Sequence, residues 1–281
     1  MTAYSWEQIQ QTGLAEMPEI GKIQIRDALR PMNMEVHPDM IEFLLLYSGC
    51  KRMWVEQTRY DMLGGDLLII YPGEAHGAED VIQNRSVLCY FLMTVPTAPG
   101  PFCMLDPSER EILWQRLREL PSRMLKVPAS VQREMDRLYS SVGTGAPLGA
   151  ARTRLRLMDF LFQVLDANVS ASPLPEDISA VIRCIRENRG EMLDISRMAA
   201  SVSLSESRFK QKFKQATGIP PVEFMIREKI EESKILLQDA GRTVTSVAME
   251  LGFTSSQHFS VLFKKYVGES PAQFRKRNGF V

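Results

Sequence analysis

The sequence lacks the features that mark secreted, membrane-spanning and disulfide-stabilised chains. Its four cysteines are far apart and include no C-x-x-C pair, which excludes a disulfide framework and a zinc-finger spacing. The N-terminus has no basic segment followed by an apolar one, so no signal peptide is expected. The longest apolar runs are far too short to span a bilayer. We therefore expect a reduced, cytoplasmic protein that does not enter a membrane.

The chain also lacks a net charge, because 34 basic side chains balance 34 acidic ones. Its 44% hydrophobic and 24% charged content is ordinary for a globular protein and excludes a disordered or fibrous chain. The charge is nevertheless unevenly distributed along the chain. Residues 176–281 carry 17 basic and 13 acidic side chains, a difference of +4, and residues 1–175 carry 17 and 21, a difference of −4. A basic C-terminal part suggests a local site for a polyanion.

The hydrophobic pattern changes twice along the chain. Residues 20–95 show short apolar runs between glycine and proline turns, which predicts the strands of a sandwich or small barrel. The helical period begins near Pro107 and gives three predicted helices: Ser108–Leu120, Ala129–Ser141 and Ala151–Asn168. Residues 168–175 contain prolines and small residues and are interpreted as an interdomain linker.

One face of the third predicted helix is more apolar than a single contact with a barrel requires. Leu155, Met158, Phe162 and Leu165 fall on one stripe of this helix. We therefore expect residues 101–170 to serve as a helical linker and dimerisation region, and the protein to be a homodimer.

The strongest signal is an internal repeat within residues 176–281. The pattern Phe209-x3-Phe213-Lys214-x3-Gly218-x2-Pro221-x2-Phe224 recurs fifty positions later as Phe259-x3-Phe263-Lys264-x3-Gly268-x2-Pro271-x2-Phe274. Such agreement indicates a duplicated structural unit. Each copy reads as a short helix, a tight turn and a second helix, which is a helix-turn-helix whose second helix enters the DNA major groove. The units span about 194–217 and 243–267, with N-caps expected at Asp194, Ser205 and Thr254.

This repeat resembles the DNA-binding domain of the AraC/XylS family of bacterial transcription regulators. The resemblance rests on Phe209-Lys-Gln-Lys-Phe-Lys-Gln-Ala-Thr-Gly218 with Pro221 and Arg227, and on Ala248, Gly252-Phe253, Phe259, Phe263-Lys-Lys265, Gly268, Pro271 and Phe274-Arg275. It covers about 100 residues. It implies an all-α domain of seven helices, 176–281, in which a long helix at Pro221–Gln238 joins the two units.

The resemblance also implies roles for polar side chains on the second helix of each unit. Base-reading positions are Ser207, Lys210, Gln211, Ser256, Gln257 and Ser260. Phosphate contacts are expected from Arg208, Lys214, Lys264, Lys265 and Arg275. An alternative for Gln257 is a capping box with Thr254 rather than a contact to a base.

The same family commonly senses a small molecule through a cupin-like β-barrel, which is the fold expected for residues 1–100. The order of histidine, glutamate and glycine residues here resembles the cupin motifs, but Glu35 replaces the first histidine of the usual pair. Candidates for an effector pocket are His37, Glu42, Tyr47, Trp54, Tyr71 and His76. A metal site from Glu35, His37, Glu42 and His76 is the less favoured reading, so no metal or other cofactor is expected.

We therefore expect an α+β multidomain chain that acts as a ligand-responsive, sequence-specific regulator of transcription and not as an enzyme. Its expected partners are promoter DNA, a small metabolite such as a sugar or sugar derivative, and RNA polymerase if it is an activator. Two alternatives stay open. One is a cupin-type metal-dependent enzyme with a helical accessory domain, and the other is a regulator that senses a protein partner.

Overall fold

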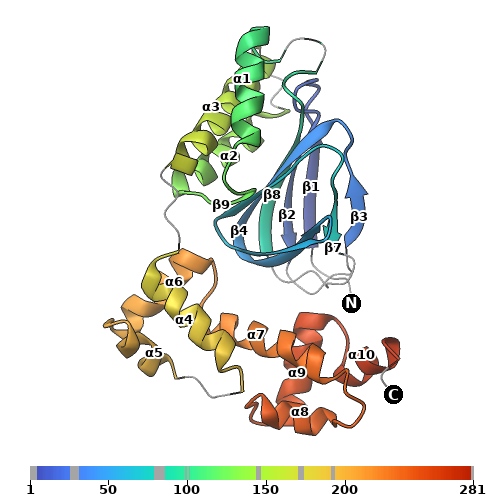
Figure 1. Cartoon of the computed structure of the whole chain (residues 1–281), viewed down its shortest axis with the longest axis vertical. Helices are drawn as coiled ribbons and strands as arrows, with labels where there is room; N and C mark the ends of the chain where they lie inside the picture. The colour runs from blue at the N-terminus through green and yellow to red at the C-terminus, as the bar shows by residue number, and fades with distance from the viewer. Residues whose placement is uncertain are drawn as a thin grey trace.

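The computed structural model describes residues 5–25, 32–78, 86–98, 100, 102–143, 147–169, 174–190 and 194–279. A β-sheet with three covering helices forms the N-terminal part, and an all-helical part follows (Figure 1). The strands are β1 (Ser5–Gln11), β2 (Glu19–Ile25), β3 (Met32–Val36), β4 (Met40–Val55), β5 (Thr58–Leu63), β6 (Asp66–Ile70), β7 (Ala75–Ala78), β8 (Ser86–Thr94) and β9 (Met124–Lys126).

The 16-residue strand β4 organises the sheet. Its first half pairs with β8 and β6, and its second half pairs with β5 and β7, all antiparallel. The main strand order is β1-β2-β8-β4-β6-β9, and β3 pairs with β7. Since successive side chains of a strand point to opposite faces, Phe43 and Leu45 join one apolar core while Leu44 and Leu46 join another. The sheet therefore has a buried core on each face.

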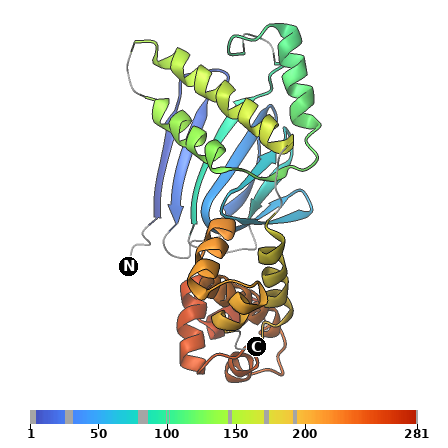
Figure 2. The same ribbon diagram turned by 90° about the vertical axis from the view of Figure 1, so that its left-hand side faces the viewer.

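Helices α1 (Pro107–Arg118), α2 (Ala129–Ser141) and α3 (Gly149–Val169) cover the first of these faces (Figure 2). Phe160 of α3 meets the rings of Phe43 and Phe91 edge-on, with centroids 5.9 and 5.3 Å away. The three rings belong to one core with the apolar side chains of α1 and α2. The helices thus lie on the sheet and share its core.

The C-terminal part contains seven helices among its described residues, as expected: α4 (Glu176–Glu187), α5 (Ile195–Ser201), α6 (Glu206–Thr217), α7 (Pro221–Leu236), α8 (Val244–Glu250), α9 (Ser256–Val267) and α10 (Pro271–Arg277). They form two separate cores. Phe209, Phe213 and Phe224 lie in the first, and Phe259, Phe263 and Phe274 lie in the second. Helix α7 contributes to both, and its 16 residues are about 24 Å long.

The predicted α+β organisation is confirmed, and the long joining helix ends at Leu236 rather than at Gln238. The cupin assignment of the sheet and the boundaries 1–100, 101–170 and 176–281 stay predictions. Within the described ranges, no helix has both the length and the apolar character that crossing a membrane requires.

Two phenylalanines of α3 test whether this helix belongs to the core of the sheet. Phe160 is fully buried, whereas Phe162 is 50% exposed. Phe160→Ala leaves a cavity against Phe43 and Phe91 and should lower the free energy of unfolding by about 3–5 kcal/mol, while Phe162→Ala should lower it by less than about 1 kcal/mol. Urea unfolding of both variants measures the difference. Equal losses would contradict the packing.

Candidate nucleic-acid interface

The first helix-turn-helix consists of α5 and α6, and each helix is capped by a side chain that the sequence identifies. The Asp194 carboxylate accepts a hydrogen bond from the Ser196 N–H at 3.0 Å. The Ser205 hydroxyl accepts one from the Arg208 N–H at 3.4 Å. Helix α6 ends at Gly218, whose φ of 77° lies in the left-handed region that favours glycine.

The second helix-turn-helix, α8 and α9, repeats this plan with one difference from the prediction. Thr254 is not the N-cap of α9. Ser255 is, because the helix begins at Ser256 and the Ser255 hydroxyl accepts from the His258 N–H at 3.1 Å. The Thr254 hydroxyl instead contacts Nδ1 of His258 at 3.1 Å. Gln257 is therefore not at the third position of a capping box with Thr254, and its side chain is exposed.

The predicted base-reading side chains of α6 lie on the face away from its buried phenylalanines, whereas those of α9 only partly clear that side. On α6, Ser207, Lys210 and Gln211 are exposed while Phe209 and Phe213 are buried. On α9, Gln257 is exposed, and the remaining two are half-buried. The three positions of each helix are spaced i, i+3 and i+4 or i, i+1 and i+4, so each set shares one side of its helix.

Local contacts hold some of these side chains without removing them from the surface. Lys210 Nζ lies 3.0 Å from Glu206 Oε2, one turn earlier on α6, and both side chains are about half exposed. Such a pair is weak in water, so Lys210 can exchange Glu206 for a base acceptor at low cost. The Ser260 hydroxyl donates to the Ser256 carbonyl at 2.8 Å, which uses its one proton within the helix.

Four of the five predicted phosphate contacts, Arg208, Lys214, Lys264 and Lys265, are exposed on α6 and α9. Arg275 differs. Its guanidinium donates to the carbonyls of Arg242 at 2.6 Å, Asp239 at 3.1 Å and Ala240 at 3.3 Å. These bonds fix the loop after α7, so Arg275 has a structural role in the described residues, and its contact with phosphate stays a prediction.

The six candidates for the effector pocket do not converge on one place. Tyr47 faces the helices, where its hydroxyl lies 3.1 Å from Asp136 Oδ1 of α2. Tyr71 also faces them and donates to the Leu117 carbonyl at 2.7 Å. Glu42, like Leu44, points to the other face of the sheet, because side chains alternate along β4. Trp54 lies near the end of the same strand, where it pairs with Gly77 and Arg59. Of the predicted set, His37, Glu42 and His76 lie together.

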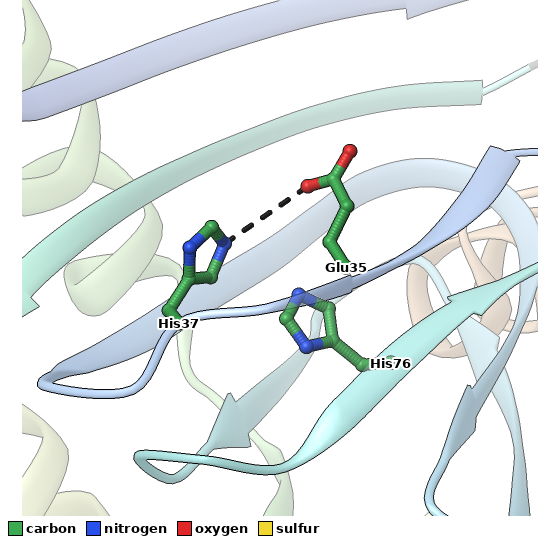
Figure 3. A group of neighbouring side chains, drawn as sticks. All are labelled: Glu35, His37 and His76. Carbon is green, nitrogen blue, oxygen red and sulfur yellow. Dashed lines mark ion pairs between the residues drawn. The ribbon is translucent and has the colours of Figure 1, made fainter.

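These three residues and Glu35 form a cluster where β3, β4 and β7 meet, and Figure 3 shows Glu35, His37 and His76 of this cluster. His76 is fully buried; its Nε2 lies 2.8 Å from Glu42 Oε2 and its Nδ1 lies 3.0 Å from the Glu74 carbonyl. The rings of His37 and His76 have centroids 5.2 Å apart, and His37 Nε2 is 3.9 Å from Glu35 Oε2. Potential ligand atoms of Glu35, His37 and His76 lie within 4.8 Å of one another, a nitrogen and oxygen set that suits a divalent transition metal.

Because an acceptor faces each ring nitrogen, the doubly protonated imidazolium of His76 satisfies both contacts. Burial by itself lowers the pKa of His76. The hydrogen bond and negative charge of Glu42, together with the Glu74 carbonyl, outweigh burial and raise the pKa above its ordinary value of 6.5. The cluster is thus held by a buried ion pair.

Lys51 is a buried charged residue outside the predicted set of site residues. It is 7% exposed, and burial lowers its pKa to about 8, with the charge of Glu42 opposing that shift. A signal was present in the sequence, because Lys51 lies two and four residues before Met53 and Val55 and so shares the inward face of β4 with them.

Comparisons with known proteins agree with this geometry. Residues 198–277 match a family described as a helix-turn-helix domain. A MmsAB operon regulatory protein of Pseudomonas aeruginosa is 33% identical over 101 residues, which cover 36% of this chain and 33% of that protein. The HTH-type transcriptional activator RhaS of Escherichia coli is 28% identical over 260 residues, which cover 88% of this chain and 89% of that protein.

Among solved structures, the DNA-binding domain of AdpA in complex with a target DNA is 27% identical, with a TM-score of 0.35 over 36% of this chain and 91% of that chain. The matched residues 198–277 begin within α5 and run to the end of α10, so they cover nearly all of both helix-turn-helix units, and the relatives are regulators of transcription rather than enzymes. These findings identify the C-terminal part as an AraC-type helix-turn-helix domain and the chain as similar to sequence-specific, DNA-binding regulators of transcription.

The ion pair between His76 and Glu42 predicts a pH dependence of stability. A raised pKa means that the pair contributes fully below about pH 6.5 and that its contribution is lost as the pH rises through the folded-state pKa. The free energy of unfolding of the wild type should therefore fall between pH 6.5 and more alkaline pH, as measured by urea unfolding. Glu42→Gln should remove this fall, and His37→Gln should preserve it. A fall of equal size in Glu42→Gln would contradict the assignment.

Proposed function

We propose that the chain reads DNA through α6 and α9 together and that its N-terminal part makes this binding responsive to a ligand. The observation that carries the proposal is the duplication. Two helix-turn-helix units have equivalent caps, equivalent buried phenylalanines and polar faces open to solvent. A single basic helix could be a solvated surface, but two equivalent ones on one domain match the successive major grooves of a duplex.

The proposed base-reading residues have the chemistry that the major groove demands. Lys210 can donate to guanine O6 and N7, and Gln211 and Gln257 can pair with adenine N6 and N7. Ser207, Ser256 and Ser260 tolerate several bases, although the hydroxyl of Ser260 is bonded to its own helix. The first unit should therefore contribute more base discrimination than the second. Arg208, Lys214, Lys264 and Lys265 would neutralise phosphates and contribute affinity without sequence preference.

The N-terminal part is proposed to sense a small metabolite, such as a sugar or sugar derivative, and the protein to act as an activator that contacts RNA polymerase. The name of RhaS, which aligns over most of both chains, describes a transcriptional activator and supports this role. The ligand class follows from the family resemblance alone. Glu42, Lys51 and His76 are all buried, and the charge of Glu42 acts on Lys51, so these residues would offer both charges to a polar ligand.

The homodimer is proposed to form through the outer surface of α1 and α3. Along the predicted stripe, Leu155 is 53% and Phe162 is 50% exposed, whereas Met158 is 8% exposed and belongs to the core. Ile112 of α1 is 59% exposed and lines, with Phe162, a groove of about 460 Å³ between the two helices. Exposed apolar side chains gathered along such a groove fit a second copy of the chain.

Substitutions on the two sides of α3 test the dimer. Leu155→Glu with Phe162→Glu should give a folded monomer, because both side chains reach solvent and their charges would be buried without partners in a dimer. Met158→Glu should instead unfold the N-terminal part, since its side chain lies in the core. Sedimentation velocity and circular dichroism separate the two outcomes. A double variant that stays dimeric would place the interface elsewhere.

Two lysines test how DNA is read. Lys210→Ala should relax base preference in one half of the site at a cost of roughly 1–3 kcal/mol. Lys264→Ala should weaken binding to every sequence about equally and reduce the salt slope by about one unit. Titrations against single-base variants of a selected site at several salt concentrations measure both effects. If Lys210→Ala left base preference intact and lowered the salt slope, Lys210 would be a phosphate contact.

A further inference from the structure

The second half of β4 packs Met53 and Val55 into the core of the sheet on one side and touches the helical part on the other. Arg52 Nη1 lies 3.0 Å from Glu231 Oε2 of α7, and Asp61 of β5 orients Arg52 from the side through a 2.7 Å hydrogen bond. One guanidinium nitrogen of Arg227, also on α7, donates to Sγ of Cys50 at 2.6 Å. In Figure 2 the helical part lies directly below the strand ends, and these contacts join the two.

The two contact residues on β4 are spaced by nearly the same distance as the two contact residues on α7. Cys50 and Arg52 are two residues apart on one face of a strand, which corresponds to roughly 6.6 Å. Arg227 and Glu231 are one turn apart on one face of a helix, which corresponds to roughly 6 Å along its axis. Each strand residue therefore meets one helix residue in register. A chance encounter of two surfaces would rarely pair both positions.

A second set of contacts joins the turn after β5 to the end of α6. The Gly64 N–H donates to the Thr217 carbonyl at 3.0 Å, and Leu63 packs on the apolar core of the first helix-turn-helix. A Cβ at Gly64 would lie 2.7 Å from the Cα of Gly218, so the two backbones can meet only because both residues are glycines. We call Cys50, Arg52, Leu63 and Gly64 the docking surface.

Arg227 connects the docking surface to the second unit. It is 5% exposed on α7, and it pairs with Glu223 at 2.7 Å. Its guanidinium carbon lies 5.6 Å from the ring centroid of Tyr266, a residue of α9. A planar guanidinium can stack on an aromatic ring while its edge donates hydrogen bonds, which a lysine cannot do. Arg227 therefore contacts Cys50 of β4 and Tyr266 of α9 at once.

We propose that the docking surface holds α7 so that the second recognition helix, α9, is placed for DNA, with Arg227 as the positioning residue. The bound partner is the chain's own DNA-binding domain. The side chains of Ser207, Lys210, Gln211 and Gln257 are exposed in this docked arrangement, so docking does not cover them. Docking favours DNA binding because it removes conformational freedom that binding would otherwise cost.

Docking goes beyond DNA recognition, because it gives ligand binding in the N-terminal part a route through β4 to the DNA-binding domain. Strand β4 carries Glu42 of the buried cluster at one end and the docking residues at the other. A ligand that binds more tightly to one arrangement of β4 would shift the docking equilibrium by its difference in affinity. The Arg52–Glu231 pair borders a cavity of about 720 Å³ between the two parts, so solvent and salt reach it.

The test uses the full chain and a DNA site selected by the wild type from a random pool. The variants are Arg52→Ala, Glu231→Ala and their combination. Arg59→Ala is the matched control, because Arg59 pairs with Asp61 on the same hairpin at 3.2 Å, and among the described residues no hydrogen bond or ion pair joins it to the helical part. Each single variant should weaken DNA binding about two- to fivefold, the double variant should be no weaker than either, and Arg59→Ala should match the wild type.

A second measurement separates positioning from a general loss of stability. When the half of the site read by α9 is replaced by unrelated sequence, Arg52→Ala should bind as tightly as the wild type, since the affected helix then contributes no base contacts. Additive losses, a loss that persists on the altered site, or tighter binding by a single variant would each overturn the proposal. A wild type that selects no DNA sequence at all would instead overturn DNA reading itself.

Discussion

The packing of three phenylalanine rings recurs in both halves of the DNA-binding domain, and the rest of that domain depends on it. In the first half, Phe209 and Phe213 lie 5.6 Å apart, and Phe213 lies 5.6 Å from Phe224. In the second half, Phe259, Phe263 and Phe274 repeat this with 5.5 Å for both distances. Two buried rings one turn apart fix the rotation of a helix about its axis. On α6 this rotation leaves Lys210 and Gln211, which lie between the two rings in sequence, exposed to solvent.

Two small separate cores do not by themselves fix the orientation of the two halves of the DNA-binding domain relative to each other. Helix α7 contributes to both cores, and Arg227 and Glu231 tie the same helix to strand β4. Helix α9 is thus contacted from two sides, by its own phenylalanines in the core and by Arg227 of α7, which also contacts Cys50 of β4. Because one strand reaches from the His76–Glu42 pair to Arg52, a change inside the sheet has a short covalent path to the DNA-binding domain.

The repeat made the helical part predictable, since caps, glycines and phenylalanines occur at the same spacing twice. Ala129–Ser141 was predicted with its observed bounds because its period is regular. Strands β1 and β5 were missed because Gln8, Gln10, Arg59 and Asp61 give them too few apolar residues for a strand signal. The effector candidates were predicted from residue type alone. Because side chains alternate between the two faces of a strand, Tyr47 and Glu42 of β4 point to opposite faces of the sheet and do not share a pocket. The docking surface left no signal, because pairing of Arg52 with Glu231 depends on the tertiary fold.

The central claim is that one chain places two different recognition helices in adjacent major grooves. Hydroxyl-radical footprinting of the full chain on a selected DNA site tests it most directly. The account predicts two protected segments with centres about 10 bp apart on one face of the duplex, in an asymmetric sequence. The segment read by α6 should show the stronger base preference. A single protected segment, or two segments on opposite faces, would contradict the claim.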